Sequence, residues 1–224
     1  MESTEKKANV LLLGGGAVGA IAALNIESGG LGSVTAVLRS NFKVVEEEGY
    51  KIESVDHGNF KGWRPTKVVN SVPDNCPDIP PSLVSLIAPA VTPGHTTIGM
   101  IQNGLNIEAP LFAAFPTNMV LSGVSMIDSH EDVPGTIHHE FADDLLLGAF
   151  HNPSIKNPER EIATAKEFIK IYGAAGKTNV RFNDNVPYSR WRKLIFHAVL
   201  NPLCAIRGWT MLESGLQGAL SKVW

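Results

Sequence analysis

Short apolar runs alternate with helical patterns along most of the chain. The run Asn9–Leu13 leads through a glycine-rich turn into a second apolar stretch, Ala20–Ile26. The β-branched run Ser33–Leu38 follows, and then a short helical pattern over Asn41–Glu48. Strands that alternate with helices are typical of βαβ units and a parallel sheet. The pattern therefore predicts an α/β fold with a Rossmann-type doubly wound sheet.

The next segments break this regular alternation. Three β-rich segments predict a small meander: Tyr50–Ser54, Gly58–Trp63 and Thr66–Val69. A doubly wound sheet should then continue with a strand buried on both faces, rich in Val, Ile and Leu. Instead, Asn70–Pro81 contains four prolines, which exclude a central strand. We expect the sheet to lack one strand at this point.

The rest of the chain returns to alternation and ends in a long helix. We expect helices over Leu83–Ala90 (capped by Ser82), Leu105–Phe115 and Ala163–Ala175, and strands over Thr96–Ile101, Asn118–Ile127, Thr136–Phe141, Leu145–Phe150 and Asn179–Phe182. From Pro187 the pattern is helical, so we place the end of the first domain near residue 183. His138 and His139 are adjacent on a strand and should point to opposite faces, a poor arrangement for a metal.

The glycine-rich turn has the G-x-G-x-x-G spacing of a dinucleotide-binding fold, with Gly14, Gly16 and Gly19. The first glycine permits the tight turn, the second lets the backbone approach a pyrophosphate, and the third lets the helix lie close to the strand. The free N–H groups at the start of that helix, including Ala17 and Val18, would hold the phosphates.

Arg39 follows the second predicted strand, 20 residues after Gly19. An acidic residue at this place binds the ribose 2′-hydroxyl of NAD, whereas an arginine suits the 2′-phosphate of NADP. We therefore expect NADPH, held by Arg39 together with Ser40 and Asn41. The alternative is an exposed arginine in a loop.

Composition narrows the class of protein. The chain has 224 residues, 44% of them hydrophobic, a formal net charge of −3 and two cysteines far apart. Mild acidity gives no reason to expect a nucleic-acid partner or an anionic membrane. Two distant cysteines indicate a reducing compartment, the cytoplasm, and no zinc site. Lys6 and Lys7 before an apolar run resemble a signal peptide, but the glycines and the polar Asn25 and Glu27 argue against one.

Polar residues on the last helix supply the candidate chemistry. Lys193, His197 and Asn201 recur every four residues and should form one stripe, either lining a cleft or facing solvent. Pro202 should kink the helix beside them. Asn103, in Gln-Asn-Gly after a predicted strand, would lie at the ligand crevice of a parallel sheet or form an ordinary turn.

These blocks together resemble the ketopantoate reductase (2-dehydropantoate 2-reductase) family. The resemblance rests on the glycine turn with Arg39, on Gln102-Asn103-Gly104, and on Trp191-Arg192-Lys193-Leu194 with His197 and Asn201-Pro202-Leu203. It implies an NADP-binding Rossmann domain, residues 1–183, and a truncated helical substrate domain, residues 184–224. It also implies NADPH-dependent reduction of a small 2-keto acid, a step of pantothenate biosynthesis.

The resemblance further implies roles for single residues. Lys193 would be the proton donor, Asn103 would face both cofactor and substrate, Asn201 would bind the substrate, and Arg39 the 2′-phosphate. His197 would also lie on the substrate side, although the family often has asparagine there, so the identity of the oxyacid stays open. The oligomeric state stays open too, a homodimer included.

Two departures favour alternative interpretations. The family has a buried strand and a nearby lysine where this chain has Asn70–Pro81, and its members continue through further helices beyond the position of Trp224. The chain could therefore be a truncated or spliced isoform that binds nucleotide weakly without turnover. A related oxyacid dehydrogenase is the remaining alternative.

Overall fold

A three-stranded parallel sheet forms the N-terminal part of the fold. The computed structural model describes residues 6–71 and 82–208. Strands β1 (Ala8–Leu13), β2 (Gly32–Val37) and β5 (Lys67–Val69) form the sheet in the order β1-β2-β5. Helix α1 (Ala17–Ser28) connects β1 to β2 and buries almost all of its length, which explains why its sequence is apolar on every side.

The pairing of β5 corrects the predicted meander. Thr35 of β2 pairs with Lys67 in parallel, so this segment belongs to the same sheet as β1 and β2. Of the three segments predicted as a meander, β3 (Tyr50–Ser54) and β4 (Gly58–Trp63) form an antiparallel hairpin, and β5 does not join it. The three residues of β5 are too few to show a strand pattern in the sequence. A parallel pair also joins segments that are distant in the sequence, so local residues do not indicate the partner.

A second sheet extends the hairpin. β3 pairs in parallel with β9 (Thr136–Phe141), which pairs antiparallel with β8 (Asp128–Val133). The prediction missed β8, since its sequence, Asp-Ser-His-Glu-Asp-Val, is largely polar and lies on the surface.

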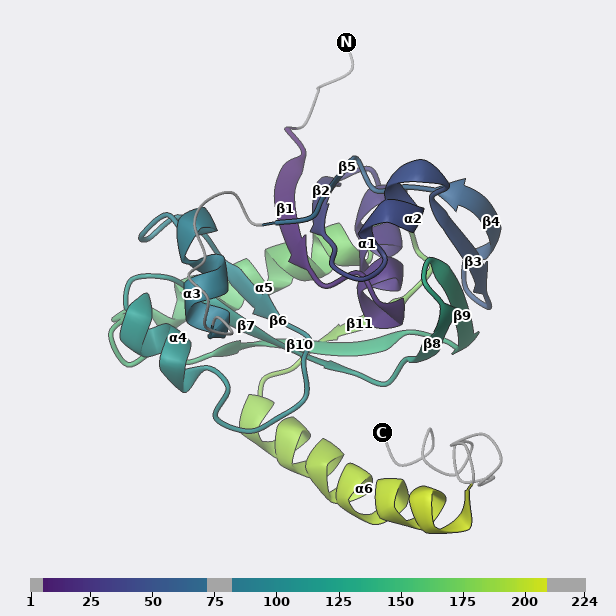
Figure 1. Ribbon diagram of the computed structural model, residues 1–224. Helices are drawn as coiled ribbons and strands as arrows, with labels where there is room; N and C mark the ends of the chain where they lie inside the picture. Colours follow the sequence, from purple (N-terminus) through teal and green to yellow (C-terminus); the bar gives the residue numbers. More distant parts are fainter. Residues whose placement is uncertain (1–5, 72–81, 209–224) are drawn as a thin grey trace.

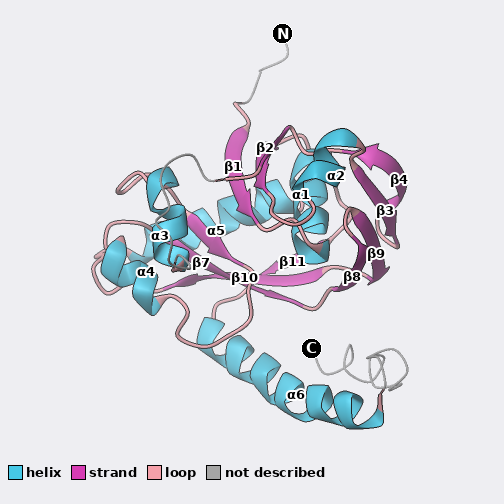
Figure 2. Ribbon diagram, viewed as in Figure 1, coloured by secondary structure: helices cyan, strands magenta, loops and turns pink. Residues whose placement is uncertain are grey.

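The other strands form a separate four-stranded sheet. Its order is β11-β10-β7-β6, made of β6 (Ile98–Met100), β7 (Val120–Ser125), β10 (Asp144–Phe150) and β11 (Asn179–Phe182). Among residues 6–71 and 82–208, no strand pairs with the outer edge of β1 or of β6. The sheet of β1, β2 and β5 is thus separate from the sheet of β6, β7, β10 and β11, in line with the prediction that one strand is missing (Figures 1 and 2). Most of the proline-rich segment itself, residues 72–81, lies outside the described residues.

Short helices flank these sheets. α2 (Phe42–Glu47) follows β2, and α3 (Leu83–Ile87) continues into a 3-10 turn, Ala88–Ala90. Ser82 caps α3 as predicted, by accepting a hydrogen bond from the Ser85 N–H at 3.1 Å. α4 (Ala109–Ala114) is shorter than predicted, whereas α5 (Pro158–Tyr172) begins earlier because Asn157 caps it.

The main core lies where α1 meets the sheets. Ile21 and Leu24 of α1, Ile52 of β3 and Leu145 of β10 are essentially inaccessible to solvent and belong to one apolar cluster. Elements distant in the sequence are therefore held together around the helix that follows the glycine turn.

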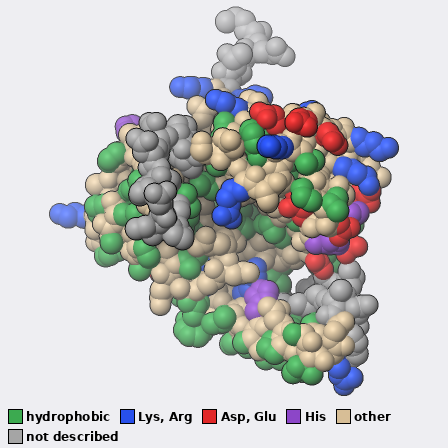
Figure 3. Space-filling view, in the orientation of Figure 1, with side chains coloured by type: hydrophobic (Ala, Val, Ile, Leu, Met, Phe, Trp, Pro, Cys, Tyr) green, Lys and Arg blue, Asp and Glu red, His purple; other side chains and the backbone are tan. Residues whose placement is uncertain are grey.

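Helix α6 (Val186–Arg207) projects from this body as an arm (Figure 1). Asn185 caps the N-terminus of α6. The helix continues without a break through Pro202, and Gly208 ends it in the left-handed conformation at φ +66°. Figure 3 shows hydrophobic side chains gathered along the arm. Within the described ranges, no helix is both long and apolar enough to cross a membrane.

Candidate active site

The glycine turn between β1 and α1 has the backbone geometry expected from its spacing. Gly14 has φ +93°, a conformation that side chains rarely adopt. A Cβ on Gly19 would lie 2.0 Å from the carbonyl oxygen of Gly14, so only glycine lets the helix approach the turn. Gly16 caps α1 without any side-chain hydrogen bond. The first-turn N–H groups of α1 are consequently presented without a capping side chain.

Buried side chains form hydrogen bonds to the backbone of the glycine turn. The carbonyl oxygen of Gly15 accepts hydrogen bonds from Asn41 Nδ2 at 2.8 Å and from the Tyr50 hydroxyl at 2.7 Å. Glu131 Oε1 accepts a second hydrogen bond from Asn41, at 2.9 Å. Burial, followed by the charge of Glu131, raises the pKa of Tyr50, so its hydroxyl stays protonated as a donor.

This arrangement corrects the expected role of Asn41. We predicted a phosphate ligand, but the side chain is buried and donates to the Gly15 carbonyl oxygen and to Glu131. Arg39 and Ser40, by contrast, are exposed. The turn lies close to them, because the Gly14 N–H donates to the carbonyl oxygen of Val37, two residues before Arg39.

The predicted substrate-side residues line one cleft of about 360 Å³ between α6 and the ends of β6 and β7. Its lining residues are Gln102, Asn103, Gly104, Gly123, Val124, Arg190, Lys193, Leu194, His197 and Asn201. Asn103, Lys193, His197 and Asn201 are therefore brought together, which favours the cleft interpretation of the helical stripe over a fully solvated face. The glycine turn and Arg39 are not among the residues that line this cleft.

Lys193 has the largest pKa shift among the cationic side chains of the cleft. Its ammonium donates a hydrogen bond to the carbonyl oxygen of Ser125 at the end of β7. Burial, and secondarily the positive charge of Arg190, lowers the pKa of Lys193 to about 8. A lysine with such a pKa can release and regain a proton near neutral pH.

His197 and Asn201 lie one turn apart and contact each other. Asn201 Nδ2 is 3.3 Å from His197 Nδ1. Burial and the neighbouring Lys193 lower the pKa of His197, although the Asn201 contact opposes this shift. The imidazole is therefore biased toward its neutral form, which can both donate and accept a hydrogen bond.

Arg190 is a residue of the cleft that the sequence analysis missed. Its guanidinium donates to Ser122 Oγ at 2.8 Å and to the carbonyl oxygens of Gly104, at 2.8 Å, and Gln102, at 3.2 Å. It also lies 4.9 Å from the ring centroid of Phe150. Arg190 therefore ties α6 to the turn that carries Asn103. The only sequence signal that Arg190 belongs to the cleft is its position one helical turn before Lys193.

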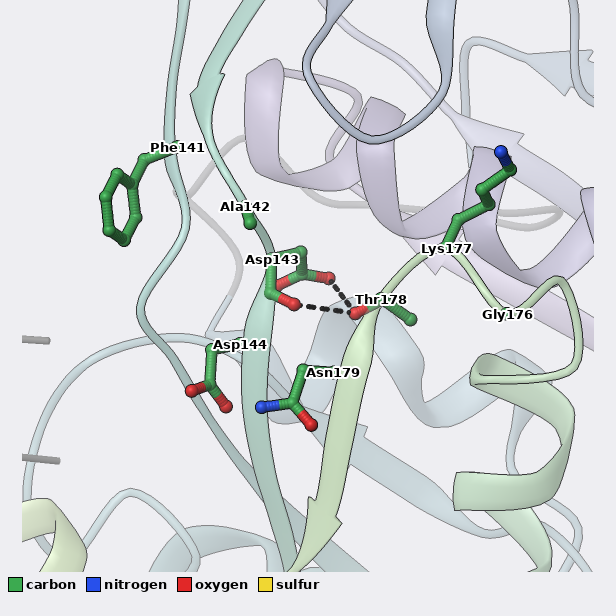
Figure 4. Close-up of a pocket in the computed structure, with 8 residues that line it drawn as sticks. All are labelled: Phe141, Ala142, Asp143, Asp144, Gly176, Lys177, Thr178 and Asn179. Atoms are coloured by element: carbon green, nitrogen blue, oxygen red, sulfur yellow. Dashed lines mark hydrogen bonds between the residues drawn. The ribbon is translucent and has the colours of Figure 1, made fainter.

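A second hollow, of about 480 Å³, lies between the start of β10 and the turn before β11 (Figure 4). Two of its polar residues contact each other, because the Thr178 hydroxyl donates to the Asp143 carbonyl oxygen at 2.9 Å and to Oδ2 of the same residue at 3.1 Å. None of the predicted site residues lines it. We therefore place the candidate site in the α6 cleft.

Asp143 is the centre of a buried polar network beneath that hollow. Oδ2 accepts hydrogen bonds from Asn25 at 3.0 Å and from the Tyr172 hydroxyl at 2.7 Å, and Oδ1 accepts one from Ser125 at 3.3 Å. Burial raises the pKa of Asp143, whereas the hydrogen bonds from Tyr172, Thr178 and Ser125 oppose the shift. The network joins α1, α5 and the end of β7.

The strand histidines His138 and His139 differ in burial. His139 is buried, with Nδ1 2.8 Å from Ser54 Oγ, whereas His138 is only partly buried. Within the part of the chain that the structure describes, no group of three or more His, Cys, Asp or Glu side chains is arranged to hold a metal.

Comparison with known proteins identifies the family. Residues 10–152 match the profile described as "Ketopantoate reductase PanE/ApbA". The chain belongs to the ketopantoate reductase family. An uncharacterized protein of Saccharomyces cerevisiae, YDL144C, is 32% identical over 89% of this chain and 64% of its own length. A 2-dehydropantoate 2-reductase of Nostoc sp. is 23% identical over 87% of the chain and 62% of its own length.

Solved structures agree with the predicted α/β Rossmann-type fold. The 2-dehydropantoate 2-reductase of Methylococcus capsulatus superposes with a TM-score of 0.71 at 29% identity, over 90% of this chain and 65% of that protein. D-mandelate dehydrogenase bound to NADH has a TM-score of 0.72 at 17% identity, over 89% of this chain and 64% of that one, which is a likeness of fold. The chain therefore spans less than two thirds of the length of these relatives.

Proposed function

We propose that this chain carries the nucleotide site and substrate-binding residues of an NADPH-dependent 2-keto acid reductase of the 2-dehydropantoate type. The observation that carries the proposal is the single cleft shared by Asn103, Lys193, His197 and Asn201. The low pKa of Lys193, about 8, supports its role as proton donor.

The glycine turn fits a dinucleotide on two observations. The space around Gly14 is open, because a Cβ there would meet no atom within 4 Å, and the start of α1 has no side-chain cap. The N–H groups of Ala17, Val18 and Gly19 would face a pyrophosphate at the positive end of the helix. Arg39, exposed beside the turn, would pair with the 2′-phosphate of NADPH, since guanidinium geometry suits phosphate oxygens.

The cleft residues would act on the keto acid as follows. NADPH, when bound, supplies the hydride that adds to the carbonyl carbon. The Lys193 ammonium hydrogen-bonds the keto oxygen, stabilises its developing negative charge and transfers a proton to it, which completes the alcohol. Asn103 and Asn201 orient the substrate through their amides, and His197 contributes a further polar contact.

A second candidate function is nucleotide binding without turnover. It is favoured by the outer edge of β1, with which no strand pairs among residues 6–71 and 82–208. In this case the chain binds the nucleotide at the glycine turn but does not reduce a keto acid. We also infer a division of the chain into residues 1–183 and residues 184–224, and a cytoplasmic location.

Nucleotide titration and a reduction assay separate these functions. The purified chain is titrated with NADPH and NADH by nicotinamide fluorescence, and 2-dehydropantoate reduction is followed by the loss of absorbance of the reduced nicotinamide. We expect tighter binding of NADPH, weakened by Arg39→Ala. Turnover abolished by Lys193→Ala but not by Lys177→Ala, a lysine of the other hollow, supports the reductase; binding with no turnover supports the second function. Tighter binding of NADH would reject the role of Arg39.

A further inference from the structure

Glu131 brings a carboxylate to the glycine turn from another sheet. It lies on β8, which packs against α1 but belongs to a different sheet from β1. Its Oε2 atom is 3.8 Å from the position that a Cβ on Gly16 would occupy. In a turn of this kind, the second glycine leaves that space free so that a pyrophosphate can approach the backbone. An acidic group therefore lies beside the place where the phosphates would bind.

Two hydrogen bonds fix the orientation of this carboxylate. Glu131 Oε1 accepts from Asn41 Nδ2 at 2.9 Å and from the Gly135 N–H at 2.8 Å. Asn41 is buried, and Gly135 lies in the turn that joins β8 to β9. Among residues 6–71 and 82–208, no group donates a hydrogen bond to Oε2. Both donors thus hold Oε1, and Oε2 is the oxygen left toward Gly16.

The charge of Glu131 is not neutralised by a neighbouring cation. No Lys, Arg or His in the described part of the chain forms an ion pair with it. Its negative charge acts on the turn, since it adds to burial in raising the pKa of Tyr50, the residue that donates to the Gly15 carbonyl oxygen. An unneutralised carboxylate in this place would repel an anionic ligand.

The same charge suits the N-terminus of α1. This helix has no side-chain cap and no acidic residue in its first turn. Negative charge near the N-terminus of a helix is stabilising, and Glu131 supplies it from outside the helix. A pyrophosphate would use the same positive end of α1. The carboxylate and the nucleotide therefore compete for one electrostatic position.

We propose that Glu131 sets the affinity of the glycine turn for a dinucleotide, by holding a fixed negative charge against the pyrophosphate. This inference rests on the proposed binding of a nucleotide at the turn. The chain binds the dinucleotide less tightly than the turn and Arg39 alone would allow. Because differences in affinity are mostly differences in dissociation rate, the carboxylate also speeds release of the oxidised cofactor after reduction.

Glu131→Gln tests the proposal on the full chain. The amide oxygen can still accept from Asn41 and Gly135, so the variant removes the charge and keeps the hydrogen bonds. We expect it to bind ADP and NADPH at least about tenfold more tightly by calorimetric and fluorescence titration. Glu140→Gln is the matched control, because Glu140 is exposed on the neighbouring strand β9 and the net charge changes equally. It should leave both affinities within about twofold, since solvent and salt screen an exposed charge.

Urea unfolding without nucleotide separates this effect from a change in fold stability. Glu131→Gln should unfold at a lower urea concentration than the wild type, because α1 loses the negative charge near its N-terminus. A residue with a structural role alone would lower stability and affinity together. Weaker or equal binding of ADP by the folded Glu131→Gln variant overturns the proposal.

Adenosine 2′-phosphate shows which phosphate the carboxylate opposes. This ligand carries the phosphate proposed for Arg39 but no pyrophosphate, so Glu131→Gln should leave its affinity unchanged. An equal gain for adenosine 2′-phosphate and for ADP overturns the proposal. ADP lacks the nicotinamide and the 2′-phosphate, so tighter ADP binding supports the role of Glu131 even if the chain fails to reduce a keto acid. Absence of ADP binding to both variants overturns it.

Discussion

The guanidinium of Arg190 donates a hydrogen bond to the carbonyl oxygen of Gly104 at 2.8 Å. This contact spans 86 positions of the sequence and links the helix that carries Lys193 to the turn that carries Asn103. Because Arg190 also binds the neighbouring Gln102 carbonyl, the turn is held at two points. The spacing between the two proposed substrate-binding elements is therefore set by a buried arginine that need not touch the substrate.

Removal of this arginine should destabilise the fold. Arg190→Leu leaves the carbonyl oxygens of Gln102 and Gly104 and the Ser122 hydroxyl without their donor, at a cost of about 2–4 kcal/mol in the free energy of unfolding. Urea denaturation measures the change. Arg192→Ala, whose guanidinium lies 5.9 Å from the ring of the exposed Tyr188, is the control and should change stability by less than about 1 kcal/mol. Equal losses in both variants would contradict a special role for Arg190.

Two glycines of the turn should respond differently to alanine. Gly19→Ala places a methyl group 2.0 Å from the Gly14 carbonyl oxygen, so we expect a loss of several kcal/mol, about 2–4, by thermal or urea unfolding. Gly16→Ala meets nothing closer than 3.8 Å and has an ordinary φ of −68°, so the fold should tolerate it.

The same pair separates folding from ligand binding. If the backbone of Gly16 approaches a pyrophosphate, as we propose, Gly16→Ala should weaken NADPH binding at least about tenfold while leaving unfolding unchanged. Fluorescence titration provides the comparison. Unchanged affinity in a folded Gly16→Ala variant would contradict close approach of the nucleotide at this residue.

The stability of the chain should depend on pH through Lys193. Its pKa is lowered from 10.5 to about 8 in the folded state. Between these two values the unfolded chain binds a proton that the folded chain does not, so this group makes the free energy of unfolding rise with increasing pH. Lys193→Met should therefore stabilise the fold by about 1–2 kcal/mol at pH 7, because it removes the buried charge. The gain should shrink as pH approaches 10.5, and a gain independent of pH would contradict the assignment.

Keto acid reduction should lose activity on the alkaline side. Only the ammonium form of Lys193 can donate a proton, so kcat/KM should fall as pH rises through about 8. The reverse oxidation needs the neutral amine and should rise over the same interval. Steady-state rates in both directions measure this dependence. Lys193→Arg, which stays protonated, should abolish the alkaline limb along with most of the activity.

The Asp143 network should tolerate an isosteric amide but not truncation. In Asp143→Asn the amide oxygen can take the place of Oδ2, which accepts from Asn25 and Tyr172, while the amide nitrogen can donate to the Ser125 hydroxyl. We expect a change below about 1 kcal/mol in urea unfolding. Asp143→Ala leaves these buried donors without an acceptor and should cost about 2–4 kcal/mol. Comparable losses would show that charge, rather than hydrogen bonding, matters at this position.

Local features of the fold and the site follow from the sequence. The glycine turn, helix α1, the Ser82 cap and the stripe of Lys193, His197 and Asn201 were all predicted in place. Each depends on neighbouring residues alone: the absence of a Cβ, a hydroxyl three residues before an N–H group, or a repeat near the helical period. Such features need no knowledge of distant partners.

Features that join distant segments were decided by the tertiary structure. The parallel pairing of β5 with β2, the buried role of Asn41 behind Gly15, and the bonds from Arg190 to the Gly104 turn connect positions tens of residues apart. The residues next to a polar side chain do not reveal whether its donor group will bind a carbonyl oxygen or water. Packing around α1 selects these partners, because a buried polar group must be satisfied by whatever group the fold brings near it. The sequence alone therefore determined which residues could act, and the tertiary structure determined which of them meet in one cleft.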